Sequence, residues 1–261
     1  MKKTMKKTKW MITILGFIFF ITFAIAFVNC GDSGSKNENG ESSTENFTLT
    51  VDKNNIHVID HSYHASASLP AGNYTISWKS GGICGGASCS SPDDYSPIFA
   101  FVSEDSSKQF FYLLQDPGDS IQVTQSRKDE IYAWYMDINT FDNKGQATLS
   151  ISGQPDLIVD KFNCEVFNPS DFAEHSLSEG HYKIQWKEGG ITCGSNPNEY
   201  VPLVIFISED PLKNFFYLLP NCLSSVEIDQ NPNPNGRILA WYMDINSFDN
   251  EGEAIIAILK W

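Results

Sequence analysis

Two acidic loops of the same composition carry the side chains best suited to holding a metal ion. Both follow the pattern Asp-x-Asn-x-x-Asp-Asn-x-Gly, at residues 137–145 and 244–252. Carboxylate and amide oxygens gathered in one turn are the ligands that Ca²⁺ prefers, and the glycine permits a sharp bend. The pattern predicts calcium binding by the following residues: Asp137, Asn139, Asp142, Asn143, Asp244, Asn246, Asp249 and Asn250.

The same loops have a purely structural interpretation, in which Asp and Asn cap their own backbone in hairpin turns. The spacing does not fit an EF-hand, whose ligands alternate over a twelve-residue loop. The pattern alone leaves both interpretations open. We expect no enzyme, because no Ser-His-Asp order, Gly-rich phosphate loop or pair of glycosidase carboxylates can be singled out.

An internal repeat determines the expected domain organisation. Residues 133–147 (AWYMDINTFDNKGQA) recur as residues 240–254 (AWYMDINSFDNEGEA), at an offset of 107 residues. Further matches pair 49–53 with 157–161, 72–78 with 180–186 and 110–114 with 215–219. A repeat of this length is a whole domain. We therefore predict one domain at residues 47–153 and a second at residues 155–261.

Each repeat has the strand pattern of an all-β fold. Residues 74–78 and 147–151 alternate apolar with polar side chains, as half-buried strands do. Residues 98–102 and 110–114 are short apolar runs rich in aromatic side chains. Clusters of Gly, Pro, Asn and Asp separate these segments. The pattern predicts two tandem β-sandwich domains of jelly-roll-like type.

The histidines are not part of the repeated pattern. His57, His61 and His64 lie close together in the first repeat, and the second repeat does not reproduce them. His175 and His181 fall elsewhere. A metal or catalytic role would be expected to survive duplication in one copy, so we expect these side chains at the surface or at strand edges.

The first 29 residues have the three parts of an export signal. Five lysines precede an apolar stretch, Trp10–Val28, which ends at Asn29-Cys30. The segment Phe27-Val28-Asn29-Cys30 resembles the relaxed lipoprotein signal of spirochaetes. The resemblance implies that the chain is exported, cleaved after residue 29 and lipidated at Cys30. It also implies that the lipid anchors the protein to the outer membrane, with the cell surface as one location. Residues 30–46 are polar and predict a disordered tether. A transmembrane anchor is the alternative, because 19 apolar residues could just span a bilayer.

The net charge of the chain limits the classes of molecule that it can bind. The formal net charge is −14, and loss of the five lysines of residues 1–29 would make it −19. Such a negative charge repels nucleic acid and anionic membrane surfaces.

With Cys30 lipidated, five of the six cysteines remain, and an odd number leaves at least one thiol without a partner in the chain.

Each repeat resembles the PA-IL-like galactophilic lectins, small calcium-dependent β-sandwich proteins of bacteria. The shared features are a Gly-x-x-Ile strand, a Gly-rich loop, an apolar strand, an aromatic strand ending in Asp, a turn of the Asn-Asn-x-Gly type and a final alternating strand. In this chain the first Asn of the turn is Asp, and the loop is two residues shorter than in that family. The resemblance implies that Asp137 with Asp142-Asn143 bind Ca²⁺, and that Asp244 with Asp249-Asn250 do the same. It also implies a backbone carbonyl ligand near Cys84 or Cys193.

In place of the sugar-contacting His-Pro-Asp-Gln of that family, the chain has Ser91-Pro92-Asp93-Asp94 and Asn196-Pro197-Asn198-Glu199. The resemblance implies ligand binding by Asp93, Asp94, Asn198 and Glu199. Together the sequence predicts a membrane-anchored binding module, calcium-dependent and directed at carbohydrate, with a glycan or a host or envelope protein as partner. The alternative is a metal-free surface lipoprotein that binds proteins and has no catalytic activity.

Overall fold

The computed structural model describes residues 45–54, 56–84, 91–105, 109–138, 140–193, 201–208, 216–230, 236–244 and 250–261. The predicted signal peptide and Cys30 lie outside this range. So do five of the predicted ligands: Asn139, Asn198, Glu199, Asn246 and Asp249. For Asp93, the structure describes the backbone alone. No helix in the described part of the chain is long and apolar enough to cross a membrane.

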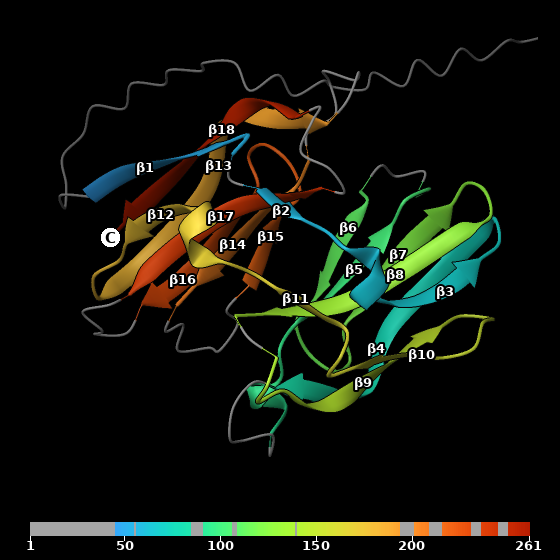
Figure 1. Ribbon diagram of the computed structural model, residues 1–261. Helices are drawn as coiled ribbons and strands as arrows, with labels where there is room; N and C mark the ends of the chain where they lie inside the picture. The colour runs from blue at the N-terminus through green and yellow to red at the C-terminus, as the bar shows by residue number, and fades with distance from the viewer. Residues whose placement is uncertain are drawn as a thin grey trace, which may run out of the picture.

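The fold is all-β, as predicted, and is built from four sheets (Figure 1). Two of them are built mainly from strands of the first repeat. A four-stranded sheet has the order β10 (Leu157–Asp160), β9 (Lys144–Ile151), β4 (Gly72–Cys84), β7 (Ser120–Gln125). A five-stranded sheet has the order β11 (Cys164–Val166), β8 (Asp129–Asp137), β5 (Ile98–Val102), β6 (Phe111–Leu114), with β3 (Ala65–Leu69) also paired to β8.

The other two sheets repeat this plan, mainly with strands of the second repeat. The four-stranded sheet has the order β1 (Glu45–Asp52), β18 (Asn250–Lys260), β13 (Gly180–Cys193), β16 (Ser225–Gln230). The five-stranded sheet has the order β12 (Ala173–Ser176), β17 (Arg237–Asp244), β14 (Leu203–Ile207), β15 (Phe216–Leu219), with β2 (Ile56–Val58) also paired to β17. Short 3-10 helices connect strands at η1 (His61–Tyr63), η2 (Pro92–Asp94) and η3 (Pro169–Asp171).

The two repeats exchange their first two strands. β1 and β2 belong to the first repeat but pair with β18 and β17 of the second. β10 and β11 belong to the second repeat but pair with β9 and β8 of the first. In Figure 1 the blue strand β1 lies beside the red strand β18. The sheets therefore cross the sequence boundary between residues 153 and 155.

Hydrogen bonds of the same kind hold the exchanged segments in both halves. The Tyr135 hydroxyl donates to the carbonyl oxygen of Lys161 at 2.9 Å. The Tyr242 hydroxyl donates to the carbonyl oxygen of Lys53, also at 2.9 Å. Each tyrosine thus ties its own repeat to the turn that connects the exchanged strands of the other.

Three hydrophobic clusters fill the spaces between the sheets. Two lie inside the halves, each between a four-stranded and a five-stranded sheet. The third is rich in aromatic side chains from both five-stranded sheets, including Trp134 and Trp241. On β5, Ile98 and Ala100 face the inner cluster while Phe99 faces the shared one. The apolar runs of the sequence are therefore strands buried on both faces.

A β-bulge after a buried tryptophan recurs in both repeats. The register of β4 against β9 shifts between Trp78 and Ser80, and Gly81 has a φ of 70°. A Cβ on Gly81 would lie 2.3 Å from the carbonyl oxygen of Gln146, so only glycine fits there. The Trp78 indole N–H donates to the Gly81 carbonyl at 2.8 Å. The bulge aims the end of β4 at the acidic loop, because Cys84 lies opposite Lys144.

Candidate functional site

A pocket of about 610 Å³ lies where the first acidic loop meets the exchanged segment of the second repeat. One wall comes from the first repeat: Tyr63, Thr140, Phe141 and Asn143. The other wall comes from the second repeat: Lys161, Phe162, Cys164, Glu165 and Val166. The strand exchange creates this pocket, since neither repeat supplies both walls. Its volume is within the range of small-molecule binding sites.

Aromatic rings form the rim of the pocket. Phe141 is 91% exposed, Phe162 is 72% exposed and Tyr63 is 56% exposed. The Lys161 ammonium lies 5.0 Å from the centroid of the Phe162 ring. The Asn163 side-chain amide donates to the Tyr63 carbonyl oxygen at 3.0 Å and so ties the two walls together. Large apolar side chains gathered at an exposed site mark a place of interaction.

A thiol and an amide form part of the floor. Asn143 and Cys164 are both buried, and the Asn143 amide nitrogen lies 3.8 Å from the Cys164 sulfur. Cys164 is a free cysteine, whereas Cys84 and Cys222 each form a disulfide, in line with the expected odd thiol. Burial raises the pKa of the Cys164 thiol to about 11, against the opposing effect of its hydrogen bond with Tyr135. The thiol therefore stays protonated and is a poor nucleophile.

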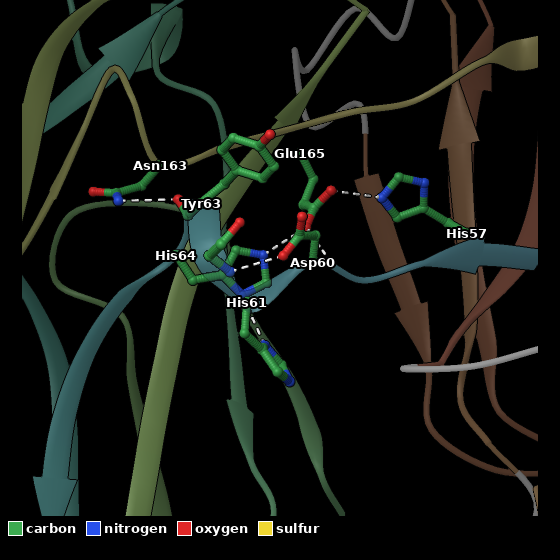
Figure 2. Close-up of polar contacts among 8 residues, drawn as sticks. His57, Asp60, His61, Tyr63, His64, Asn163 and Glu165 are labelled. Carbon is green, nitrogen blue, oxygen red and sulfur yellow. Dashed lines mark hydrogen bonds and ion pairs between the residues drawn. The ribbon is translucent and has the colours of Figure 1, made fainter.

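Glu165, next to Cys164 on β11, also lines the pocket and has a buried carboxylate (Figure 2). It is 6% exposed and accepts three hydrogen bonds. His64 Nε2 donates at 2.8 Å, His57 Nε2 at 3.3 Å and the Asp60 backbone N–H at 2.8 Å. Burial by itself would raise the pKa of Glu165, but these hydrogen bonds outweigh it and lower the pKa to about 2. Glu165 is therefore ionised.

The carboxylate also sets the tautomers of the neighbouring histidines. Since His64 Nε2 donates to Glu165, the Nδ1 atom of a neutral His64 is an acceptor. The His61 Nδ1 atom lies 3.2 Å from it and donates the proton. Burial and the neighbouring His64 lower the pKa of His61, which favours its neutral form. The His64 ring stacks on Trp134 with the ring centroids 4.2 Å apart.

These contacts correct the expectation of a surface or strand-edge position for two of the five histidines. His57 and His64 are buried. The reason is visible when the repeats are aligned at the offset of 49–53 to 157–161, which makes His57 and Glu165 equivalent positions. The exchange brings the two equivalent positions into contact. Phe172 takes the place of His64 in the second repeat and stacks on Trp241 at 4.1 Å.

The predicted calcium ligands are partly engaged by the protein itself. The Asp137 carbonyl accepts from the Phe167 N–H at 3.0 Å, and its Oδ1 accepts from the Ile138 N–H at 2.6 Å. Asp142 is half-buried beside Asn143. In the second repeat Asp244 and Asn250 are buried, and the Asp244 carbonyl accepts from the Ile59 N–H at 2.8 Å.

Of the predicted calcium ligands that the structure describes, Asn143 alone lines the pocket. Within the described ranges, no group of three or more His, Cys, Asp or Glu side chains could hold a metal ion. With Asn139, Asn246 and Asp249 outside those ranges, calcium stays a prediction.

One of the residues predicted to contact sugar has a described side chain, that of Asp94. Asp93 and Asp94 belong to η2, and Asp94 is not among the residues that line the pocket. The Asp94 carboxylate accepts a hydrogen bond from the Ser91 N–H at 3.2 Å, which is a turn-capping contact. Their role in ligand binding stays a prediction.

Comparisons with known proteins do not assign the chain to a family. No family model and no curated protein matches it. The secreted serine protease VesC from Vibrio cholerae is 12% identical with a TM-score of 0.20, over 74% of this chain and 47% of the protease. This chain therefore spans about half of the protease. The stem and receptor-binding domain of spike protein P1 from bacteriophage PM2 is 8% identical with a TM-score of 0.17, over 87% of this chain and all of that one. These TM-scores are too low to carry an argument.

Proposed function

We propose that this protein is an exported, lipid-anchored binding module whose ligand site is the pocket beside the 137–145 loop. The observation that carries the proposal is the meeting of two segments in one concave, aromatic-rimmed site. The loop already singled out in the sequence forms one wall through Asn143, and the exchanged segment 161–166 forms the other. Cys30 and the polar tether would hold this module at the membrane, with a glycan or an envelope or host protein as partner.

The chemistry of the floor supports binding over catalysis. A nucleophile needs a lowered pKa or an adjacent base, and burial raises the pKa of the Cys164 thiol instead. A general acid needs a proton near neutral pH, and the pKa of Glu165 is lowered to about 2. Both groups can orient a ligand without reacting with it.

In the proposed function, calcium orders the loop that forms one wall of the pocket. Bound to the 137–145 loop, it would fix the position of Phe141 and Asn143 and so order one wall of the pocket. The equivalent loop at residues 244–252 would bind a second ion. This part of the proposal rests on the loop composition and on the lectin resemblance.

Calcium is expected to raise the melting temperature of the full chain in a polyoxyethylene detergent, relative to EDTA. A ligand that binds only the native state stabilises it by RT ln(1 + [L]/Kd), so a micromolar site at about 1 mM Ca²⁺ would add about 4 kcal/mol. Mg²⁺ at the same concentration is the control, because it dehydrates reluctantly and demands a tighter shell. The double variant Asp137→Ala/Asp244→Ala should lose the shift. A shift that survives in this variant would contradict the assigned ligands.

One observation favours a metal-free alternative, a surface lipoprotein that binds proteins. Asp137 caps its own turn through the Ile138 N–H, and its carbonyl is engaged by Phe167, as expected for a structural hairpin. Identical melting in EDTA and in Ca²⁺ would favour this alternative and leave the pocket as a calcium-independent site.

A further inference from the structure

The Lys161 side chain places a positive charge against an aromatic ring that lines the pocket. The Lys161 ammonium lies over the Phe162 ring at 5.0 Å from its centroid. Aromatic faces carry negative potential and attract cations within about 6 Å of the ring centre. Lys161 is exposed, so it can move into solvent when another cation takes its place.

The pocket also includes an ionised carboxylate among its lining residues. Glu165 is 6% exposed and lines the pocket together with Tyr63, Phe141 and Phe162. Its hydrogen bonds come from two imidazole N–H groups and one backbone N–H, which fix the carboxylate in place (Figure 2). The net charge of −14 on the chain adds a long-range attraction for cations.

The second repeat provides an internal comparison. At the same offset, Lys161 corresponds to Lys53 and Val166 corresponds to Val58, so these two positions are unchanged. The three positions that distinguish the pocket differ, because Phe162, Tyr63 and Glu165 correspond to Asn54, Asp171 and His57. The equivalent place in the other half therefore lacks these two rings, and its carboxylate, Asp171, stands at the position of Tyr63 and not at that of Glu165.

We infer that the pocket binds an organic cation, an alkylated ammonium group such as that of choline, with its methyl groups against the aromatic rim and its charge near Glu165. Among the described residues, the equivalent positions of the other half lack the rings of Tyr63 and Phe162 and the Glu165 carboxylate, so the inference concerns this pocket alone. This inference names the ligand class of the proposed binding pocket and rests on that proposal.

The test compares choline with its neutral isostere, 3,3-dimethylbutan-1-ol, which has the same shape without the charge. Each is titrated into the full chain in a polyoxyethylene detergent, and the methyl proton resonance of the ligand is followed. We expect choline to bind at least about tenfold more tightly, which corresponds to about 1.4 kcal/mol. Equal affinity for the two, or no perturbation of the choline resonance, would overturn the inference.

Two substitutions test the residues that define the site. Phe162→Asn installs the residue of the equivalent position and is expected to weaken choline binding at least about fivefold, in keeping with one cation–π contact. Phe162 is mostly exposed, so the fold should be unaffected. Lys161→Met removes the competing cation and should strengthen choline binding, while Lys53→Met, the matched control in the other half, should leave it unchanged. Weaker choline binding in Lys161→Met would mean that Lys161 contributes to the site and does not compete with the ligand, and would overturn the inference.

The calcium experiment separates this inference from the proposed function. If calcium raises the melting temperature and choline does not bind, the cation assignment fails alone. If choline binds while the melting temperature is the same in EDTA and in Ca²⁺, the cation site stands and the calcium part of the proposed function fails. Phosphocholine titrated beside choline distinguishes the two sources of this group, because tighter binding of phosphocholine assigns a lipid headgroup and equal binding assigns the free cation.

Discussion

A fragment of residues 155–261 is expected to be a dimer. In the full chain, β10 and β11 of this segment pair with the first repeat, and their places beside β18 and β17 are taken by β1 and β2. Two copies of the fragment can restore every pairing by exchanging β10 and β11 with each other. The pseudo-twofold relation between the repeats would become a true twofold axis.

The aromatic cluster gives the second reason for dimerisation. A lone copy of the second repeat would expose a contiguous apolar face that the full chain buries between its two five-stranded sheets. This face comprises Phe172, Val204, Phe216, Leu239, Trp241 and Met243. A patch of this kind is covered in stable proteins. We therefore expect the dimer to be obligate, with unfolding that depends on protein concentration.

Sedimentation equilibrium of the fragment measures this directly. The control is residues 168–261, which keep the aromatic face but lack β10 and β11. This shorter fragment leaves the edges of β17 and β18 open and should not form a stable dimer. A folded monomer of residues 155–261 would mean that β10 and β11 can return to their own repeat, and that the exchange depends on the intact chain.

The strands themselves could be predicted from side-chain patterns, but their partners could not. Val51 pairs with Ala254 of the second repeat, and Val159 pairs with Ala147 of the first. Without the exchange, Val51 would meet Ala147 and Val159 would meet Ala254. The side chains in contact are the same in both arrangements, so no local pattern distinguishes them. The choice depends on the path of the connections through η1 and η3, which periodicity does not encode.

The candidate site, like the fold, could be predicted only in part from the sequence. The composition of the 137–145 loop was enough to single it out, and the structure places Asn143 of this loop at the pocket. The loop composition does not indicate the other wall, because that wall comes from residues 161–166 of the other repeat. The lack of repeated histidines favours surface positions, which is wrong for His57 and His64. The useful signal was that His57 and Glu165, a complementary pair, occupy equivalent positions of the two repeats.

Replacement of Glu165 is expected to have the largest effect of any single substitution proposed for this protein. Glu165→Gln removes the charge that receives N–H donors from His57, His64 and the Asp60 backbone. Hydrogen bonds to a charged group contribute more than neutral ones, and a buried pair that loses one partner is strongly destabilised. We expect a loss of about 3 kcal/mol in the free energy of unfolding at neutral pH. Urea unfolding of both proteins measures it.

The pH dependence identifies the cause of that loss. Hydrogen bonding lowers the pKa of Glu165 from 4.5 to about 2, despite the opposing effect of burial. A carboxylate with a lowered folded-state pKa contributes stability that is complete above its unfolded pKa and is lost as pH falls through the folded one. The difference between the wild type and Glu165→Gln should therefore be constant above pH 4.5 and shrink towards pH 2.

The matched control is Glu174→Gln, which removes an exposed carboxylate 3.5 Å from Arg237. Exposed ion pairs contribute less than about 1 kcal/mol, so this variant should unfold almost as the wild type does. An equal effect of the two substitutions would mean that the Glu165 carboxylate is solvated and does not join the exchanged segments. A large effect of Glu165→Gln on the free energy of unfolding that decreases in acid would support one conclusion. The ionised Glu165 side chain, which has no counterpart in the first repeat, stabilises the exchange of strands between the two repeats.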